Sequence, residues 1–356
     1  MPVSDAHLLM FDAGVGPVDI ARWMRHLDAA GADATRYRLG GIPLIVVEGG
    51  LPPPGSAGSA GLPAPMSVLP VGGGFRLGQR AVRPNGTVVS IGPTSVGDGD
   101  ITVFAGPCAV ESRGQLLDTA DAVTGYGAAG LRGGAFKPRT APYSFQGTKW
   151  AGLELLAEAR ARTGLPVLTE VVHPGHVARV YEVADAFQIG ARNMQNFALL
   201  SEVGRTGLPV VLKRGFGATV DELLAASEYI LAEGNDQVVL CERGIRTFER
   251  ATRFTLDLPV VALLKQRTHL PVMVDPSHAV GIRTLIEPVA LAAAAVGADA
   301  LLIDVHVRPE EALCDADQAL PPNEFGRLMN RLETLAMGLG RRLAVGRPLE
   351  HLGRGA

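Results

Sequence analysis

Two groups of side chains in this sequence have the chemistry of a catalytic site. The first is basic, and each member follows a short apolar run. Converging cations repel one another unless anions neutralise them, and Arg forks match phosphate and carboxylate oxygens. The chain has only four lysines, two of which belong to this group. We therefore expect a site for substrates with more than one phosphate or carboxylate, formed by Arg132, Lys137, Arg139, Arg192, Lys213 and Arg243.

The second group combines sulfur, imidazole and carboxylate side chains. Cys108, His278, Asp304 and Asp315 offer a ligand set that suits a borderline divalent ion such as Mn²⁺, Fe²⁺, Co²⁺ or Zn²⁺. Each residue alone also has a structural interpretation, because a lone cysteine is more often a packed small residue and a loop cation is often solvated or ion-paired. Cys241 and Cys314 are interpreted as structural, and we expect Cys314 to point away from Asp315.

These groups need a fold that brings distant segments together. From about residue 100, short apolar runs alternate with amphipathic stretches, as in a (β/α)₈ barrel. Residues 101–356, 256 in all, match the ~250 typical of that fold. A doubly wound sheet is the alternative, but no Gly-rich dinucleotide turn is present. Strands are expected at 102–105, 130–133, 167–170, 186–189, 210–213, 237–241, 272–275 and 300–304, and helices at 153–162, 220–232 and 281–296, among others.

Such a barrel would place both groups at one mouth. Catalytic residues of this fold come from the carboxyl ends of the strands. Cys108 follows the first strand, His278 the seventh, and Asp304 ends the eighth, with Asp315 further on. In a closed barrel the eighth strand neighbours both the seventh and the first, so these four side chains can meet.

Residues 1–75 form a separate small unit. Strands are expected at 7–12, 36–39, 43–48 and 66–71, with a helix at 18–30, an order that favours a ferredoxin-like α+β domain. The Pro/Gly/Ser-rich segment 51–65 replaces the second helix of that fold and is interpreted as a flexible linker. Residues 76–100 are expected to form a linker and a hairpin that caps the barrel.

Composition excludes several classes of partner. The net charge is −3, which gives no support for a nucleic-acid or membrane partner. Three widely spaced cysteines cannot form a disulfide framework. The N-terminus has no signal-peptide pattern, and the longest apolar stretch is too short to span a bilayer. We expect a cytoplasmic protein.

Seven motifs resemble the 3-deoxy-7-phosphoheptulonate (DAHP) synthase family, type I-beta group. The N-terminal unit also resembles the allosteric domain that some members carry, although its missing second helix argues against feedback by aromatic amino acids. The motifs occur in order between residues 106 and 320, mostly at expected strand ends. They are GPCAVES, LRGGAFKPRTAPYSFQG, QIGARNMQNF, VVLKRGFG, LCERGIRTFE, PVMVDPSHAVG and ALCDADQAL.

The resemblance implies a reaction and a role for each motif residue. The family joins phosphoenolpyruvate to erythrose 4-phosphate at the start of the shikimate pathway, needs a divalent metal and forms dimers or tetramers. Mn²⁺ is the expected ion, with Fe²⁺, Co²⁺ or Zn²⁺ as alternatives. Phosphoenolpyruvate would bind Arg132, Lys137, Arg192, Lys213 and Arg243; the aldose phosphate would bind Arg139 and Thr140; the metal would bind Cys108, His278, Asp304 and Asp315; and Asp275 and Ser277 would add substrate contacts.

Two further roles concern the chemistry itself. Lys137 is expected to donate a proton to the nascent alkoxide, and Glu242 to orient the attacking water. The sister enzyme 3-deoxy-manno-octulosonate 8-phosphate synthase usually has Ala-Asn where Pro138-Arg139 stand here, which favours the four-carbon acceptor.

Several positions depart from the family pattern. Asp304 replaces the usual Glu and is one methylene shorter. Ala141 and Ala279 each replace a serine, and Phe254 replaces an asparagine. Val307-Arg308 follows His306 in place of the common Pro-Glu. These changes leave two alternatives open. One is a paralogue that uses another phosphorylated aldose in secondary metabolism, and the other is a catalytically weak barrel that acts as a binding or regulatory partner.

Overall fold

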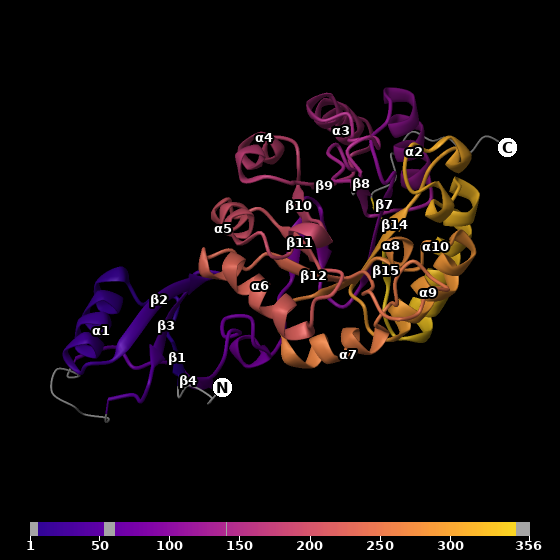
Figure 1. Ribbon diagram of the computed structural model, residues 1–356. Coiled ribbons are helices and arrows are strands. Elements are labelled where there is room, and N and C mark those ends of the chain that lie inside the picture. Colours follow the sequence, from indigo (N-terminus) through magenta and orange to yellow (C-terminus); the bar gives the residue numbers. More distant parts are fainter. Residues whose placement is uncertain (1–5, 53–60, 140, 347–356) are drawn as a thin grey trace.

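Eight parallel strands close into a barrel in this structure, a computed structural model that describes residues 6–52, 61–139 and 141–346 (Figure 1). The last strand pairs with the first, Leu302 lying opposite Phe104. This pairing confirms the barrel and excludes the open doubly wound sheet. The strands are β7 (Ile101–Gly106), β8 (Gly130–Arg132), β9 (Val167–Glu170), β10 (Ala186–Ile189), β11 (Val210–Lys213), β12 (Val238–Glu242), β13 (Val272–Val274) and β14 (Ala300–Asp304).

Helices surround the barrel, and local sequence sets where several begin (Figure 1). Ser112 caps α2, and Thr219 with Glu222 forms a capping box at α6. Asp275 accepts the backbone N–H of His278 and so starts a one-turn helix directly after β13. The helices are α2 (Arg113–Gly125), α3 (Trp150–Thr163), α4 (Val177–Tyr181), α5 (Phe197–Arg205), α6 (Val220–Ala232), α7 (Leu258–Arg267), α8 (Pro276–Val280), α9 (Arg283–Ala295) and α10 (Pro322–Gly338).

Short elements complete the barrel. A hairpin of β5 (Val89–Ile91) and β6 (Thr94–Val96) buries Val89, Ile91 and Val96 against inward side chains of the barrel, among them Cys241. This packing gives Cys241 the structural position expected for it. The remaining elements are β15 (Leu343–Ala344), which pairs with β7, and the 3₁₀ turns η1 (Arg80–Val82), η2 (Pro174–His176), η3 (Ala191–Asn193), η4 (Pro309–Glu311) and η5 (Ala316–Gln318).

The N-terminal unit is an antiparallel sheet with one helix. Strands β1 (Ala6–Met10), β2 (Asp33–Leu39), β3 (Ile42–Glu48) and β4 (Ser67–Val71) pair in the order β2-β3-β1-β4. Helix α1 (Pro17–Ala29) packs on one face, where Leu9, Phe11, Ile20 and Leu27 form a core. The described residues between β3 and β4 contain no second helix, while 53–60 of the expected linker lie outside the described residues.

Buried polar contacts attach the connecting segment to the barrel. Glu228 of α6 accepts the backbone N–H groups of Leu77 and Gly78 at 3.0 and 2.8 Å. His269, before β13, bonds Thr87 through Nδ1 and the carbonyl of Leu77 through Nε2. Burial lowers the pKa of His269 to about 4, so the ring is neutral at physiological pH. Among the described residues, no helix has the length and apolar character needed to cross a membrane.

Candidate active site

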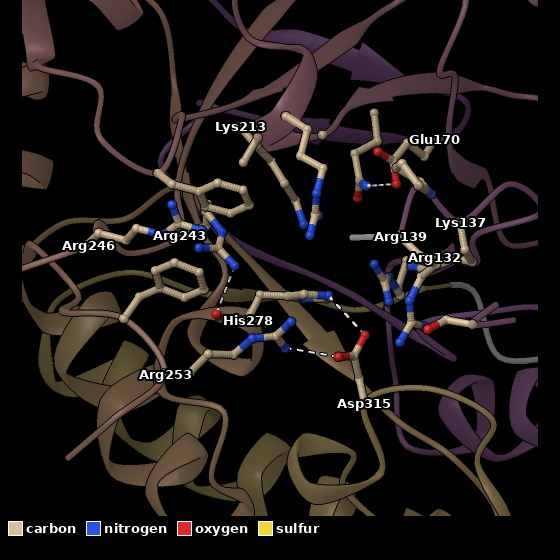
Figure 2. Close-up of a pocket in the computed structure, with 18 of the residues that line it drawn as sticks. Arg132, Lys137, Arg139, Glu170, Lys213, Arg243, Arg246, Arg253, His278 and Asp315 are labelled. Carbon is tan, nitrogen blue, oxygen red and sulfur yellow. Dashed lines mark hydrogen bonds and ion pairs between the residues drawn. The ribbon is translucent and has the colours of Figure 1, made fainter. Parts of the chain in front are cut away.

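A pocket of about 270 Å³ opens at the carboxyl ends of the barrel strands (Figure 2). All six cations predicted to converge line it: Arg132, Lys137, Arg139, Arg192, Lys213 and Arg243. Thr140 lies outside the described residues. His278 and Asp315 line the pocket as well, so one cavity joins the two groups of side chains.

Buried ion pairs hold the inner cations. The Lys213 ammonium lies 2.6 Å from Asp275, and Arg132 lies 2.5 Å from Asp304. The Nε of Arg132 is buried and has no hydrogen-bond partner among the described residues. Because an unpaired buried donor is costly, this N–H marks a position where a bound anion would be stabilised.

Asp275 and Ser277 are not among the residues that line the pocket, and their contact with substrate stays a prediction. Both are fully buried. The Asp275 carboxylate is occupied by Lys213 and by the start of α8, and Ser277 Oγ accepts the backbone N–H of Asp304 at 3.0 Å. The chain turns into α8 immediately after β13, which directs both side chains beneath the pocket floor, where they position its lining residues.

The Glu242 carboxylate bonds to groups of the chain itself, and its role in orienting the attacking water stays a prediction. Its carboxylate is fully buried and accepts from Arg214 at 2.9 Å and from the backbone N–H of Gly244 at 2.7 Å. Burial raises its pKa above the ordinary value. Both oxygens are engaged away from the pocket, and they fix the turn that follows β12.

Arg243 lies against two aromatic rings. Its guanidinium carbon is 4.1 Å from the centroid of Phe254 and 5.0 Å from that of Phe216, and the two rings stack at 5.1 Å with an angle of 7°. Among the described residues no carboxylate forms an ion pair with Arg243, which donates instead to the carbonyl of His278. Burial lowers its pKa to about 10. The arginine therefore stays charged at neutral pH and is free to pair with an anion.

Cys108, His278 and Asp315 bring three metal-ligating atoms close together. Cys108 Sγ lies 2.9 Å from Asp315 Oδ2 and 3.4 Å from His278 Nε2, and these last two atoms are 3.9 Å apart. Burial opposes ionisation of Asp315, but the charges of His278 and Arg253 and the bond from Cys108 hold its pKa well below the ordinary value. One soft, one borderline and one hard donor at these separations fit a divalent ion.

The two nitrogens of His278 face different partners. Nδ1 lies 3.0 Å from Asp275 and 3.4 Å from Asp304, whereas Nε2 faces Cys108 and Asp315. Burial would lower the pKa of His278, but the charges of Asp275 and Asp304 outweigh it and raise the pKa to about 9.

Asp304 is held on both carboxylate oxygens. Oδ1 accepts from Arg132 at 2.5 Å, and Oδ2 accepts from the Gln318 amide at 2.5 Å. The same Gln318 accepts from Arg253 at 2.7 Å. Asp304 therefore belongs to a hydrogen-bond network that links the two groups, although its oxygen also comes within 4.8 Å of ligand atoms of Cys108 and His278.

Cys314 points into the site, so the prediction that it faces away from Asp315 is wrong. Its sulfur lies within 4.8 Å of both Cys108 Sγ and a carboxylate oxygen of Asp315. The hydrogen bond between the two thiols raises the pKa of Cys108 well above its ordinary value and lowers that of Cys314. Asp315 has φ +57, in the left-handed region. The segment that carries both residues is therefore irregular at this point, and periodicity in the sequence does not indicate the direction of either side chain.

Lys137 lies directly over Cys108. Its ammonium donates to both the carbonyl and the sulfur of Cys108 at 3.0 Å. Gly134 makes room for this contact, since a Cβ there would lie 2.7 Å from the Cys108 carbonyl and 3.0 Å from Lys137 Cδ. Burial would lower the pKa of Lys137, but its interactions with Cys108, Cys314 and Glu170 raise it above the ordinary value. Lys137 is thus a protonated donor at neutral pH.

Several lining residues carried no sequence prediction of a role. Arg246 and Arg253 add two cations to the pocket, and Glu170 adds a carboxylate (Figure 2). Arg253 donates to Asp315 at 2.9 Å. The positions of Arg246 and Glu170 near strand ends could have indicated a place at the pocket. The packing of Phe216 against Phe254 joins two loops that are distant in sequence, so it could not be predicted. Of the other departures, Ala141 lines the pocket, Ala279 is buried, and Arg308 pairs with Glu311.

Comparison with known proteins gives consistent matches. The model of the DAHP synthetase I family matches residues 85–337. A phospho-2-dehydro-3-deoxyheptonate aldolase of Thermotoga maritima is 48% identical over 266 residues, which cover 75% of this chain and 79% of that protein. A 2-dehydro-3-deoxyphosphooctonate aldolase of Syntrophobacter fumaroxidans is 30% identical over 67% of this chain and 88% of its own length.

Solved structures agree with the sequence matches. The crystal structure of the phospho-2-dehydro-3-deoxyheptonate aldolase (DAHP synthase) of Thermotoga maritima superposes with a TM-score of 0.76 at 40% identity, covering 95% of this chain and 99% of that one. A truncated 3-deoxy-D-arabino-heptulosonate 7-phosphate synthase from the same organism gives a TM-score of 0.72 at 45% identity, covering 76% of this chain and all of that one.

Proposed function

The chain belongs to the DAHP synthetase I family of enzymes, and on that premise we propose that it condenses phosphoenolpyruvate with erythrose 4-phosphate and water. The products are 3-deoxy-D-arabino-heptulosonate 7-phosphate and inorganic phosphate, the first step of aromatic amino acid biosynthesis by the shikimate pathway. The single observation that carries this proposal is the convergence of six predicted cations on one cavity beside the Cys108, His278 and Asp315 cluster.

The cations divide between two anionic substrates. Arg132, Lys213 and Arg243 lie deep, and with Lys137 and Arg192 they would hold the phosphate and carboxylate of phosphoenolpyruvate. Arg139 is partly exposed and would hold the phosphate of the aldose, together with Thr140. Guanidinium groups suit both anions because they donate in parallel pairs.

The chain's own groups account for orientation and proton transfer. Carbon 3 of phosphoenolpyruvate forms a bond to the aldehyde carbon, and water adds at carbon 2. In the resulting hemiketal phosphate, the bond between carbon 2 and the phosphate oxygen breaks, which releases inorganic phosphate and leaves a ketone. The Lys137 ammonium would give its proton to the alkoxide oxygen that forms from the aldehyde. Arg132 and Lys213 would compensate negative charge at the carboxylate end of the substrate.

A divalent metal fits the residues present. Cys108, His278 and Asp315 would hold it, and when bound it would polarise the acceptor aldehyde as a Lewis acid. Two side chains compete for a fourth position, Asp304 and Cys314. Mn²⁺ is the ion expected from sequence, with Fe²⁺, Co²⁺ and Zn²⁺ as alternatives.

The acceptor proposal is tested by sugar profiling. Identity is higher to the heptonate enzyme than to the octonate enzyme, 48% against 30%, and Arg139 stands where the latter class has Asn. We expect phosphate release from phosphoenolpyruvate with erythrose 4-phosphate and little with arabinose 5-phosphate. Arg139→Ala should raise the KM for the aldose about tenfold or more, while the exposed Arg250→Ala, its control, should not. The opposite preference for arabinose 5-phosphate would overturn the assignment.

The N-terminal unit completes the proposed organisation. Its strand order β2-β3-β1-β4 with α1 on one face supports a ferredoxin-like domain over residues 1–75, followed by the linker and hairpin of 76–100 and the catalytic barrel of 101–356. We propose a regulatory role for this unit, whose described residues contain one helix. We expect a homodimer or homotetramer, to be measured by sedimentation.

A further inference from the structure

We propose that Cys314 is a ligand of the divalent metal and takes the position that the sequence pattern assigns to Asp304. The ion would then be held by Cys108, Cys314, His278 and Asp315. This inference rests on the metal dependence of the proposed function. It concerns which atoms hold the ion, which can be measured without turnover.

The orientation of His278 selects one side of its ring for the metal. The Nδ1 edge faces the Asp275 carboxylate at 3.0 Å, and Asp275 is itself fixed by Lys213 and by the start of α8. A carboxylate partner of this kind fixes the tautomer of a ligating histidine and leaves the opposite nitrogen to bind. The metal therefore belongs on the Nε2 side, which Cys108 and Asp315 face at 3.4 and 3.9 Å.

Asp304 lies at the Nδ1 edge of that ring, although one of its oxygens is also within 4.8 Å of Cys108 Sγ. Its contact to His278 is to Nδ1, at 3.4 Å. Its two oxygens already accept from Arg132 and Gln318, its backbone N–H is bonded to Ser277, and the residue is fully buried. The oxygen that faces His278 is Oδ2, and binding the metal through it would compete with the hydrogen bond from Gln318. The aspartate side chain is also one methylene shorter than the glutamate usual at this position, so its carboxylate reaches less far toward the metal.

Cys314 lies where the missing donor is needed. Its sulfur lies within 4.8 Å of Cys108 Sγ and of a carboxylate oxygen of Asp315. These are the two residues that face His278 Nε2. The side chain is buried, 6% exposed. The Cys314 sulfur therefore already lies beside two of the three other proposed ligands.

A second thiolate changes which metal the site prefers. Thiolate ligands favour Zn²⁺ and iron, whereas carboxylates suit Mn²⁺. The set of two thiolates, one imidazole and one carboxylate should therefore prefer Zn²⁺, Fe²⁺ or Co²⁺ over the Mn²⁺ expected from sequence. Cys314→Ser should weaken Zn²⁺ binding about tenfold or more and leave Mn²⁺ affinity within about threefold.

The direct test is absorption of the Co²⁺-loaded full chain. Sulfur-to-cobalt charge transfer in the near ultraviolet grows with the number of thiolates bound. We expect Cys314→Ser and Cys108→Ser each to lose about half of the wild-type intensity. Asp304→Asn should keep it, as should the control Cys241→Ala, which removes a buried thiol elsewhere in the barrel. Full intensity in Cys314→Ser would overturn the proposal.

A second measurement uses the unaltered chain and so does not depend on a variant that folds. The ¹¹³Cd resonance of the Cd²⁺-loaded protein moves downfield with each sulfur ligand. A position typical of two sulfurs supports Cys314 as a ligand, and one typical of a single sulfur contradicts it. Both readouts report binding alone. Failure of the proposed reaction would instead appear as absent phosphate release from a protein whose metal spectrum is normal.

Discussion

Arg132 at the end of β8 and Asp304 at the end of β14 form a buried ion pair of 2.5 Å. The sequence assigns one of them to substrate and the other to metal, yet in the folded chain each is the charge partner of the other. Asp304 thereby keeps the guanidinium of Arg132 in place in the pocket wall, with its Nε left unpaired among the described residues. The two groups of side chains act as one network.

This pair predicts a large cost for removing the carboxylate. Asp304→Ala leaves Arg132 charged and buried, and we expect the free energy of unfolding to fall by about 3–5 kcal/mol. Urea denaturation of the metal-free protein measures it. Asp317→Ala removes an exposed aspartate from the same region and should change stability by less than about 0.5 kcal/mol. Equal effects of the two substitutions would show that the ion pair contributes nothing.

Lys137 predicts separation of turnover from metal binding. Lys137→Met keeps the length of the side chain and removes its proton, so turnover should be abolished while the protein still binds one divalent ion. Activity and metal content are measured on the same sample. Lys149→Met, an exposed lysine from the same loop, should retain both properties. Retained turnover in Lys137→Met would remove this residue from the mechanism.

The stacked rings of Phe216 and Phe254 predict an effect on phosphoenolpyruvate binding. Phe254→Leu removes the ring nearest to Arg243, and the lost cation–π support of about 1–2 kcal/mol should raise the KM for phosphoenolpyruvate about fivefold to thirtyfold. Phe248→Leu, in the same loop but 96% exposed, is the matched control. The KM values are measured by steady-state kinetics with saturating aldose. A wild-type KM for phosphoenolpyruvate in Phe254→Leu would contradict this reasoning.

His269 predicts a pH dependence of stability. Its pKa is about 4 in the folded chain, because of burial, against about 6.5 when unfolded. Between these values the unfolded chain binds a proton that the folded chain does not. Stability conferred by the neutral ring is therefore complete above pH 6.5 and falls by about 1.4 kcal/mol per unit down to pH 4.

Comparison with a variant isolates this contribution. His269→Gln should show a shallower decline than the wild type when urea unfolding is followed from pH 7 to pH 4. The charges of Arg83, Asp236 and Arg80 also act on His269, so the difference between the two curves is the quantity to compare. Parallel curves would mean that His269 does not titrate as described.

The sequence predicts the barrel well because alternation of short apolar runs and amphipathic stretches is a local pattern. It predicts the convergence of Arg132, Lys213 and Arg243 because position at a strand end determines which mouth a residue reaches. Position alone does not set the direction of a side chain. Glu242 ends β12 and Ser277 follows β13, but both side chains are fully buried.

Long-range contacts and unusual backbone geometry account for the remaining differences. Cys314 lies close to Cys108 and Asp315 in an irregular segment where Asp315 has a left-handed conformation, which no periodicity signals. Phe216 and Phe254 stack across loops from different strands. Asp304 is paired with Arg132 on an opposite segment. Each of these depends on tertiary packing, so each needed the folded chain.

Phosphate release tests the central claim most directly. The full chain is treated with EDTA, supplied with phosphoenolpyruvate and erythrose 4-phosphate, and then given back a divalent ion, with arabinose 5-phosphate assayed in parallel. We predict no phosphate before the ion is restored, and afterwards release with erythrose 4-phosphate only. Restored ion with no phosphate from either sugar would contradict the proposed synthase and favour a non-catalytic role or a different acceptor.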